Sequence, residues 1–146
     1  MTELPWHSPV IEQLVLRRDS DALPAAIALT CADGWGTSQL LIRVAAMLLE
    51  VEAIDTPEEF AHADFRWLAP EKAVIKVDAI RSLNAFAVQT PQSAPRKVVA
   101  VADAHLMNVN AANTLLKTLE EPPPRTHILL ATAYWGRLLP TIRSRC

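Results

Sequence analysis

Short apolar runs of strand length alternate along this chain with stretches of helical periodicity. The runs are AAIALT (25–30), KVVAVADA (97–104) and THILLATA (126–133), with FRWLAP (65–70) as a weaker fourth. Continuous apolar runs, rather than alternating ones, are typical of strands that are buried on both faces, as in parallel sheets. The sequence therefore predicts an α/β fold, with an open, mostly parallel sheet of about five strands and helices on both faces.

The segments between these runs have the apolar spacing of helices. Residues 37–49 and 77–87 repeat apolar side chains on one side, and so does NAANTLLKTLEEPPP (110–124), where three consecutive prolines end the helix. The final segment, RLLPTIRSRC (137–146), is predicted to be helical around its proline. Residues 50–64 are acidic, contain a proline and are predicted to be a connection.

Composition excludes several classes of protein. A length of 146 residues fits one domain, and a net charge of -2 gives no general attraction for nucleic acid, so DNA binding would need a local patch. The sequence contains no run of about 18 apolar residues, so no membrane span is predicted. Met1–Val10 lacks the basic region and the long apolar core of a signal peptide. Cys31 and Cys146 form no CxxC pair, so a reduced, cytoplasmic chain without zinc or disulfide is expected.

The stretch CADGWGTSQL (31–40) has the position of a phosphate-binding loop but lacks its charge. Such a loop requires Gly, four residues, Gly, Lys and then Ser or Thr. Aligned on Gly36, the chain has Cys31 in place of the first glycine and Thr37 in place of the lysine, so that only Gly36 and Ser38 fit, with Gly34 as a further glycine. The backbone N–H groups at the start of the helix leave weak anion binding open, and an ordinary strand-to-helix turn is the alternative.

The run VVAVADA ends in Asp103, as a Walker B strand ends in an acidic residue. A hydrolysing ATPase of this type usually has a glutamate next, which orients water, whereas this chain has Ala104. Asp103 either holds Mg²⁺ or caps the following loop. The missing lysine and the missing glutamate together predict that the domain does not hydrolyse ATP, and an active NTPase with an unorthodox loop is the alternative.

Asn113, Lys117 and Glu120 lie on the helix face opposite the leucines, where either a solvated surface or a partner surface is expected. A free-standing DNA-binding module is a third interpretation. The near-neutral charge and the lack of interleaved aromatic and basic residues disfavour it. The four histidines have no metal-ligand spacing, so no metal site is predicted.

The sequence AANTLLKTLEEPP, followed by HILLAT and by the final Ser144-Arg145-Cys146, resembles the clamp-loader branch of the AAA+ family. Together with the defective loop, the pattern is similar to the delta-prime subunits of bacterial DNA polymerase III clamp loaders, and LAPEK (68–72) and VDAIRSL (77–83) fit it as well. The resemblance covers nearly the whole chain, most strongly over residues 97–146. It implies an AAA+ domain with a degenerate P-loop over residues 1–146.

In that family such a subunit is the stationary, non-hydrolysing member of a five-subunit ring. The resemblance implies that Arg145 is supplied in trans to the ATP site of a neighbouring motor subunit of gamma or tau type, with Arg143 as its rival; alternatively, Arg145 pairs with a carboxylate of its own domain. Thr132 corresponds to the sensor residue, and Ser144 joins the partner surface. The expected partners are the motor and delta subunits and, through the assembled loader, the sliding clamp and primer-template DNA, with no cofactor.

The chain departs from the family pattern in two respects. Relatives often carry four cysteines that form a small zinc module between the first helix and the second strand, and residues 50–64 contain no cysteine. Family members also continue beyond the Ser-Arg-Cys motif into lid and collar domains. We therefore expect this chain to be the first domain of a longer protein, which would not assemble the ring alone.

Overall fold

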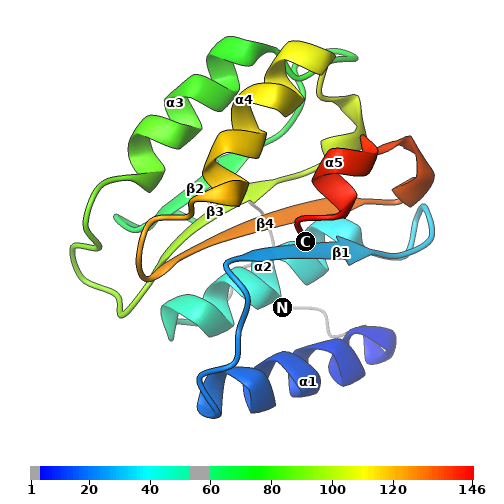
Figure 1. The fold of residues 1–146 in the computed structure, drawn as a ribbon. Helices are drawn as coiled ribbons and strands as arrows, with labels where there is room; N and C mark the ends of the chain where they lie inside the picture. The colour runs from blue at the N-terminus through cyan, green and yellow to red at the C-terminus, as the bar shows by residue number, and fades with distance from the viewer. Residues whose placement is uncertain (1–3, 53–59) are drawn as a thin grey trace.

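The computed structural model describes residues 4–52 and 60–146 (Figure 1). Within these ranges one parallel sheet contains four strands in the order β1-β4-β3-β2. The strands are β1 (Ala26–Thr30), β2 (Phe65–Leu68), β3 (Lys97–Val101) and β4 (Thr126–Thr132). The α/β class and the parallel pairing are confirmed. The number of about five strands, predicted from the alternation of apolar runs with helical stretches, is wrong for the described residues, in which only the four apolar runs form strands.

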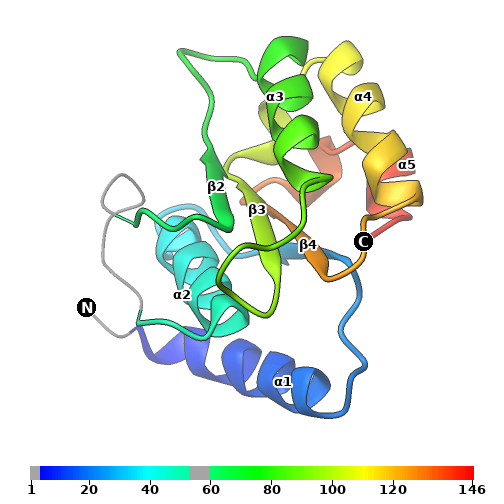
Figure 2. The same cartoon turned by 90° about the vertical axis from the view of Figure 1, so that its left-hand side faces the viewer.

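The helices form a layer on each face of the sheet, as Figure 2 shows from the side. On one face lie α1 (Ser8–Asp19) and α2 (Thr37–Leu49), and on the other lie α3 (Val77–Ala87), α4 (Val109–Glu120) and the short α5 (Pro140–Arg143). The helices predicted over 37–49, 77–87 and near Pro140 are confirmed. Of the predicted connection over 50–64, residues 53–59 lie outside the described part of the chain.

The two apolar clusters of the core explain why the strand runs are continuous. In β3 every residue is buried: Val98 and Ala100 pack toward α2, and Val99 and Val101 pack toward the α3–α4 layer. Neighbouring side chains of a strand point to opposite faces, so a strand covered on both faces needs apolar residues at every position. The same holds for β4, all of whose residues are buried.

A buried carboxylate holds the loop that enters β3. Asp64 is 0 % exposed, and its side chain accepts backbone N–H groups of Gln92, Ser93 and Ala94 at 2.6, 2.8 and 2.8 Å. Burial raises the pKa of Asp64, but these hydrogen bonds outweigh it and lower the pKa to about 2. The loop that contains Gln92, Ser93 and Ala94 is therefore fixed by one charged side chain.

The buried Lys97 lies at the start of β3 and finds partners in α3. Its ammonium donates to the Phe86 carbonyl at 3.1 Å and lies 4.1 Å from the centroid of the Phe86 ring. Burial is the main cause that lowers the pKa of Lys97, while the nearby charge of Asp64 raises it. The hydrogen bond to the Phe86 carbonyl, the aromatic face and the nearby charge of Asp64 together allow a lysine to occupy the core of this sheet.

Candidate functional site: a degenerate nucleotide loop and a distant arginine

The loop between β1 and α2 has a backbone that requires glycine. Gly34 and Gly36 have φ values of 82° and 80°, in the left-handed region, and Gly36 directly precedes the first residue of α2. A Cβ atom at Gly36 would collide with the Leu4 side chain, whereas a Cβ at Gly34 would meet open space. The strand, turn and helix of a phosphate loop are thus retained, with the N-terminal segment packed directly on the turn.

Replacing Gly36 with alanine is expected to lower the free energy of unfolding by about 1–2 kcal/mol, because the left-handed backbone opposes the new Cβ and the end of the Leu4 side chain must move aside. The matched variant Gly34→Ala meets only the backbone penalty, so we expect a loss of about 1 kcal/mol. Urea unfolding of both variants measures the difference. Equal losses would mean that the N-terminal segment does not press on the turn.

The two residues that depart from the P-loop pattern contact each other. The Cys31 Sγ atom lies 2.9 Å from the Thr37 hydroxyl oxygen, a contact in which either atom donates. Thr37 therefore satisfies its polar group within the loop. Neither side chain supplies the ammonium that a lysine would direct at the terminal phosphates.

A hollow of about 490 Å³ lies over the loop at the carboxyl ends of the strands. The described residues that line it contribute two carboxylates and no lysine or arginine: they are Leu4, Trp6, Asp33, Gly34, Gly36, Thr37, Ser38, Gln39, Asp103 and Ala133. Ser38 and Asp103, which were predicted to belong to one degenerate site, thus lie around one hollow. Two negative charges without a cationic side chain disfavour a triphosphate there.

Asp103 has a left-handed backbone, with φ of 49°, immediately before a short 3-10 helix, η2 (Ala104–Leu106). Its carbonyl accepts the Leu106 N–H at 2.9 Å, whereas its side chain makes no capping hydrogen bond to η2. Of the two roles predicted for this carboxylate, capping of the following segment is wrong. The exposed side chain lines the hollow instead.

Thr132 lies at the end of β4 and is 1 % exposed. Its hydroxyl accepts the Tyr134 N–H at 2.9 Å and lies 2.7 Å from Nδ1 of His105 in η2. The first contact closes the turn that follows β4, and the second ties the end of β4 to η2. Thr132, predicted to occupy the sensor position, does not line the hollow in the part of the chain that the structure describes.

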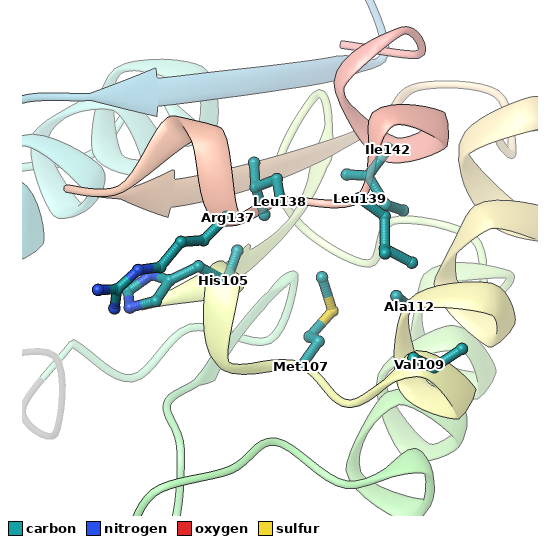
Figure 3. Close-up of a pocket in the computed structure, with 9 residues that line it drawn as sticks. His105, Met107, Val109, Ala112, Arg137, Leu138, Leu139 and Ile142 are labelled. Atoms are coloured by element: carbon teal, nitrogen blue, oxygen red, sulfur yellow. The ribbon is translucent and has the colours of Figure 1, made fainter.

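Figure 3 shows a second, much smaller cavity of about 40 Å³ behind η2. Its lining is mainly apolar and comes from η2, α4 and the segment that leads into α5, including Met107, Val109, Leu139 and Ile142. It has room for a few water molecules at most, so it is a packing gap between α4 and α5 rather than a ligand site.

The final motif lies on the surface beside the end of α4. The guanidinium of Arg145 pairs with the carboxylate of Glu120 at 3.3 Å, and the two side chains are 52 % and 43 % exposed. Pairing within the domain, which was the alternative interpretation of Arg145, is therefore observed. Exposed ion pairs contribute only about 0–1 kcal/mol, so this contact holds the side chain loosely.

The residues predicted to form a partner surface are all exposed, but they divide into two groups. Asn113 and Lys117 line a shallow hollow of about 230 Å³ between α3 and α4. Glu120 faces Arg145 instead, and the Ser144 hydroxyl donates to the Thr141 carbonyl within α5 at 3.0 Å. The structure thus brings Glu120 and Arg145 together and leaves Asn113 and Lys117 beside α3.

Arg145 and the degenerate loop lie at opposite ends of the sheet. Glu120 ends α4, and the next five residues lead into the N-terminal end of β4, so the guanidinium beside Glu120 lies near that end. The loop follows the carboxyl end of β1, which is paired in parallel with β4. A seven-residue strand spans roughly 20 Å, and this separation keeps Arg145 away from the hollow of its own domain.

Residues 6–146 match the protein family described as "DNA polymerase III, delta subunit". The chain is 46 % identical over 119 residues to the DNA polymerase III subunit delta' of Pseudomonas aeruginosa, covering 79 % of this chain and 36 % of that protein. It is 35 % identical over 155 residues to the subunit delta' of Escherichia coli, covering 97 % of this chain and 46 % of that protein.

Among solved structures, a DNA polymerase III gamma subunit-related protein from Thermotoga maritima superposes with a TM-score of 0.77 at 30 % identity, covering 90 % of this chain and 43 % of that one. The fold is thus that of clamp-loader AAA+ domains. This chain belongs to the DNA polymerase III delta-subunit family. It spans less than half the length of the relatives described here.

Neither a membrane helix nor a metal cluster is found in the described ranges 4–52 and 60–146. No helix there is long and apolar enough to cross a bilayer. No group of three or more His, Cys, Asp or Glu side chains in those ranges could hold a metal ion.

Proposed function

We propose that this chain is the AAA+ domain of a delta-prime-type clamp-loader subunit that does not hydrolyse ATP. It supplies Arg145 to the ATP site of a neighbouring motor subunit of gamma or tau type, and so supports loading of the sliding clamp onto primed DNA. The observation that carries this proposal is the exposed arginine at the end of the sheet opposite its own loop. An arginine so far from the loop of its own chain can act on a nucleotide only in trans.

The weak pair with Glu120 is compatible with this role. Breaking the ion pair between Arg145 and Glu120 costs about 1 kcal/mol or less, because both side chains are largely exposed to water. An arginine that stabilises the charge on a transferring phosphoryl group contributes roughly 4–7 kcal/mol. The gain at a neighbour's ATP site therefore exceeds the loss within the domain several-fold, and the guanidinium fork suits phosphate oxygens.

The loop of the domain supports the non-hydrolysing part of the proposal. Thr37 contacts Cys31 rather than supplying an ammonium, and Ala104 follows Asp103 where a glutamate would orient water. We expect ATP with Mg²⁺ to bind with a Kd in the millimolar range or higher. This corresponds to a binding free energy of about -4 kcal/mol or a less favourable one. Isothermal titration calorimetry checks this, with a gamma-type motor subunit as the positive control. Micromolar, Mg²⁺-dependent binding would favour the active NTPase instead.

The longer protein is required for assembly in this proposal. This chain would be its first domain, and lid and collar domains would join the ring together with the motor and delta subunits. The test is capture of the full-length protein by a purified gamma-type motor subunit. We expect a stable complex with the full-length protein and none with residues 1–146 alone. Failure of the full-length protein to bind would remove the clamp-loader assignment.

A further inference from the structure

Three arginines line a hollow at the end of the sheet opposite the degenerate loop. The hollow has a volume of about 520 Å³ and lies where β1, β3 and β4 begin and α1 ends, on one side of the molecule in Figure 1. Its charged lining consists of Arg18, Asp21, Arg96 and Arg125, and we call it the basic hollow. The net charge of the chain is -2, so this concentration of positive charge is local.

The order of the strands brings these arginines together. Arg96 directly precedes β3, Arg125 directly precedes β4, and Arg18 lies in the last turn of α1. β3 and β4 are paired in parallel, and parallel strands begin at the same edge of a sheet. The basic hollow therefore exists only in the complete fold, and no local pattern of the sequence indicates it.

The positive charge of the basic hollow is not neutralised within the described part of the chain. There, neither Arg96 nor Arg125 forms an ion pair or a side-chain hydrogen bond, and Asp21 pairs with no arginine. Arg18 donates to the carboxylate of the adjacent Asp19 at 3.2 Å. The end of α1 adds about half a negative charge, which is less than the charge of the two free guanidiniums.

The buried His127, which also lines the basic hollow, responds to this charge. Its side chain is largely buried, and its Nδ1 atom donates to the Pro24 carbonyl at 3.0 Å. Burial is the main cause that lowers the pKa of His127; the hydrogen bond to Pro24 raises it, and the positive charge of Arg96 lowers it again. The charge of Arg96 therefore acts on groups that line the hollow, and it would act on a ligand there as well.

Backbone contacts fix the walls of the basic hollow before a ligand binds. The Arg125 carbonyl accepts the Lys97 N–H at 2.8 Å, and the Ala25 carbonyl accepts the Ile128 N–H at 2.7 Å. Residues 122–124 are prolines, which restrict the turn that leads to Arg125. Little conformational freedom is lost when a ligand binds between walls that are already ordered.

The chemistry of the lining selects phosphate groups. A guanidinium presents its donors in a planar fork that matches two oxygens of a phosphate. Because the arginines come from three segments, an anion whose charges are spread over linked phosphates matches them better than an anion with one charge. The described lining contains no tryptophan, tyrosine or phenylalanine on which a base could stack. The phosphates rather than a base are therefore recognised.

We propose that the basic hollow binds a chain of linked phosphates, either free inorganic pyrophosphate or the phosphate chain of a nucleotide. Arg96 and Arg125 bind the phosphate oxygens, and Arg18 adds its charge from the end of α1. This site goes beyond the proposed function and does not depend on it, because neither Arg145 nor Glu120 is among the described residues that line the hollow.

Titration of inorganic pyrophosphate with the full-length protein, followed by ³¹P NMR in Mg²⁺-free buffer of low ionic strength, tests this proposal. Arg96→Gln and Arg125→Gln each remove one guanidinium from the lining. The control Arg17→Gln removes an exposed guanidinium of α1 that lies outside the lining. We expect the Kd to rise about tenfold in each of the first two variants and less than about twofold in the control. Urea unfolding verifies that each variant is folded.

Competition against pyrophosphate distinguishes the two sources of the phosphates. If ATP without Mg²⁺ competes more strongly than inorganic tripolyphosphate, the ligand is a nucleotide; if it competes equally or more weakly, the phosphate chain alone is bound. Both results support the proposal when the competition depends on Arg96 and Arg125. Mg²⁺ neutralises part of the phosphate charge, so it should weaken binding here, whereas it strengthens binding at a P-loop.

The inference is wrong if the protein does not bind pyrophosphate, or if the Kd is the same in Arg96→Gln, Arg125→Gln and Arg17→Gln. It is also wrong if sulfate competes as strongly as pyrophosphate, because the hollow would then take any anion. Binding of single-stranded DNA that depends on these arginines, without binding of pyrophosphate, would contradict it as well. In each case the proposed function stands, because its tests depend on Arg145 and on the degenerate loop.

Discussion

Asp64→Asn is expected to lower the free energy of unfolding by about 2 kcal/mol at pH 7. The carboxylate has a pKa of about 2 against an ordinary value of 3.8, and this difference in pKa corresponds to about 2.4 kcal/mol. The group is 0 % exposed, so solvent screening does not reduce this figure much. Asparagine keeps one acceptor oxygen for the loop but loses the charge that three N–H groups stabilise.

The pH dependence of this loss identifies its cause. Because the pKa is lowered on folding, the contribution of Asp64 is complete above pH 4 and is lost as the pH falls through about 2. Urea unfolding from pH 7 to pH 2 should therefore show the curves of the original protein and the variant converging below pH 4. The exposed Asp19→Asn serves as a control with little change at either pH. A gap that stays constant at all pH values would mean that the charge is not what fixes the loop.

Arg145→Ala in the full-length protein is expected to leave ring assembly intact and to slow ATP hydrolysis at the motor site next to it by about 10³-fold or more. The rate of ATP hydrolysis by the whole loader should fall by a smaller factor, because its other ATP sites keep their own arginines. Arg145→Lys should restore little, because an ammonium is a point charge and does not reproduce the fork of the guanidinium. The measurement is DNA-stimulated ATP hydrolysis and clamp loading by the reconstituted loader.

The rival residue provides an internal control for this prediction. Arg143 is half-buried in α5, and its Nε atom is buried without a hydrogen-bond partner among the described residues. It is therefore less available to a neighbouring subunit than Arg145, which is 52 % exposed. We expect Arg143→Ala to affect stability more than hydrolysis. Normal hydrolysis in Arg145→Ala together with a large loss in Arg143→Ala would transfer the role to Arg143.

The parts of the fold that local patterns determine could be predicted from the sequence. β3 and β4 are continuous apolar runs because both faces of the sheet are covered, and α2 and α3 have regular apolar periodicity because one side of each packs on the sheet. The first helix, α1, escaped prediction because it lies against α2 and fully buries only Leu14, which leaves a weak apolar pattern. The prediction of about five strands exceeded the four apolar runs in the sequence, and only those four runs form strands among the described residues.

The candidate site was harder to predict from the sequence, because its contacts join distant parts of the chain. The loop substitutions at Cys31 and Thr37 were visible in the sequence, but their mutual contact was not. The pair of Glu120 and Arg145 joins residues 25 positions apart, and Tyr134 reaches Asp33 across 101 positions. The second contact follows from the order of the strands, which brings β1 next to β4, and no local pattern reports either contact.

Hydrolysis by a reconstituted loader that contains Arg145→Ala or Glu120→Gln tests the trans-acting role most directly. Both substitutions break the same ion pair within the domain, but only the first removes the guanidinium. If Arg145 acts on a neighbour's ATP, the loader with Glu120→Gln should hydrolyse ATP as fast as the unmodified loader. The loader with Arg145→Ala should hydrolyse ATP slowly at the adjacent site. If both variants are equally slow, or both are unchanged, Arg145 serves only its own domain and the account is contradicted.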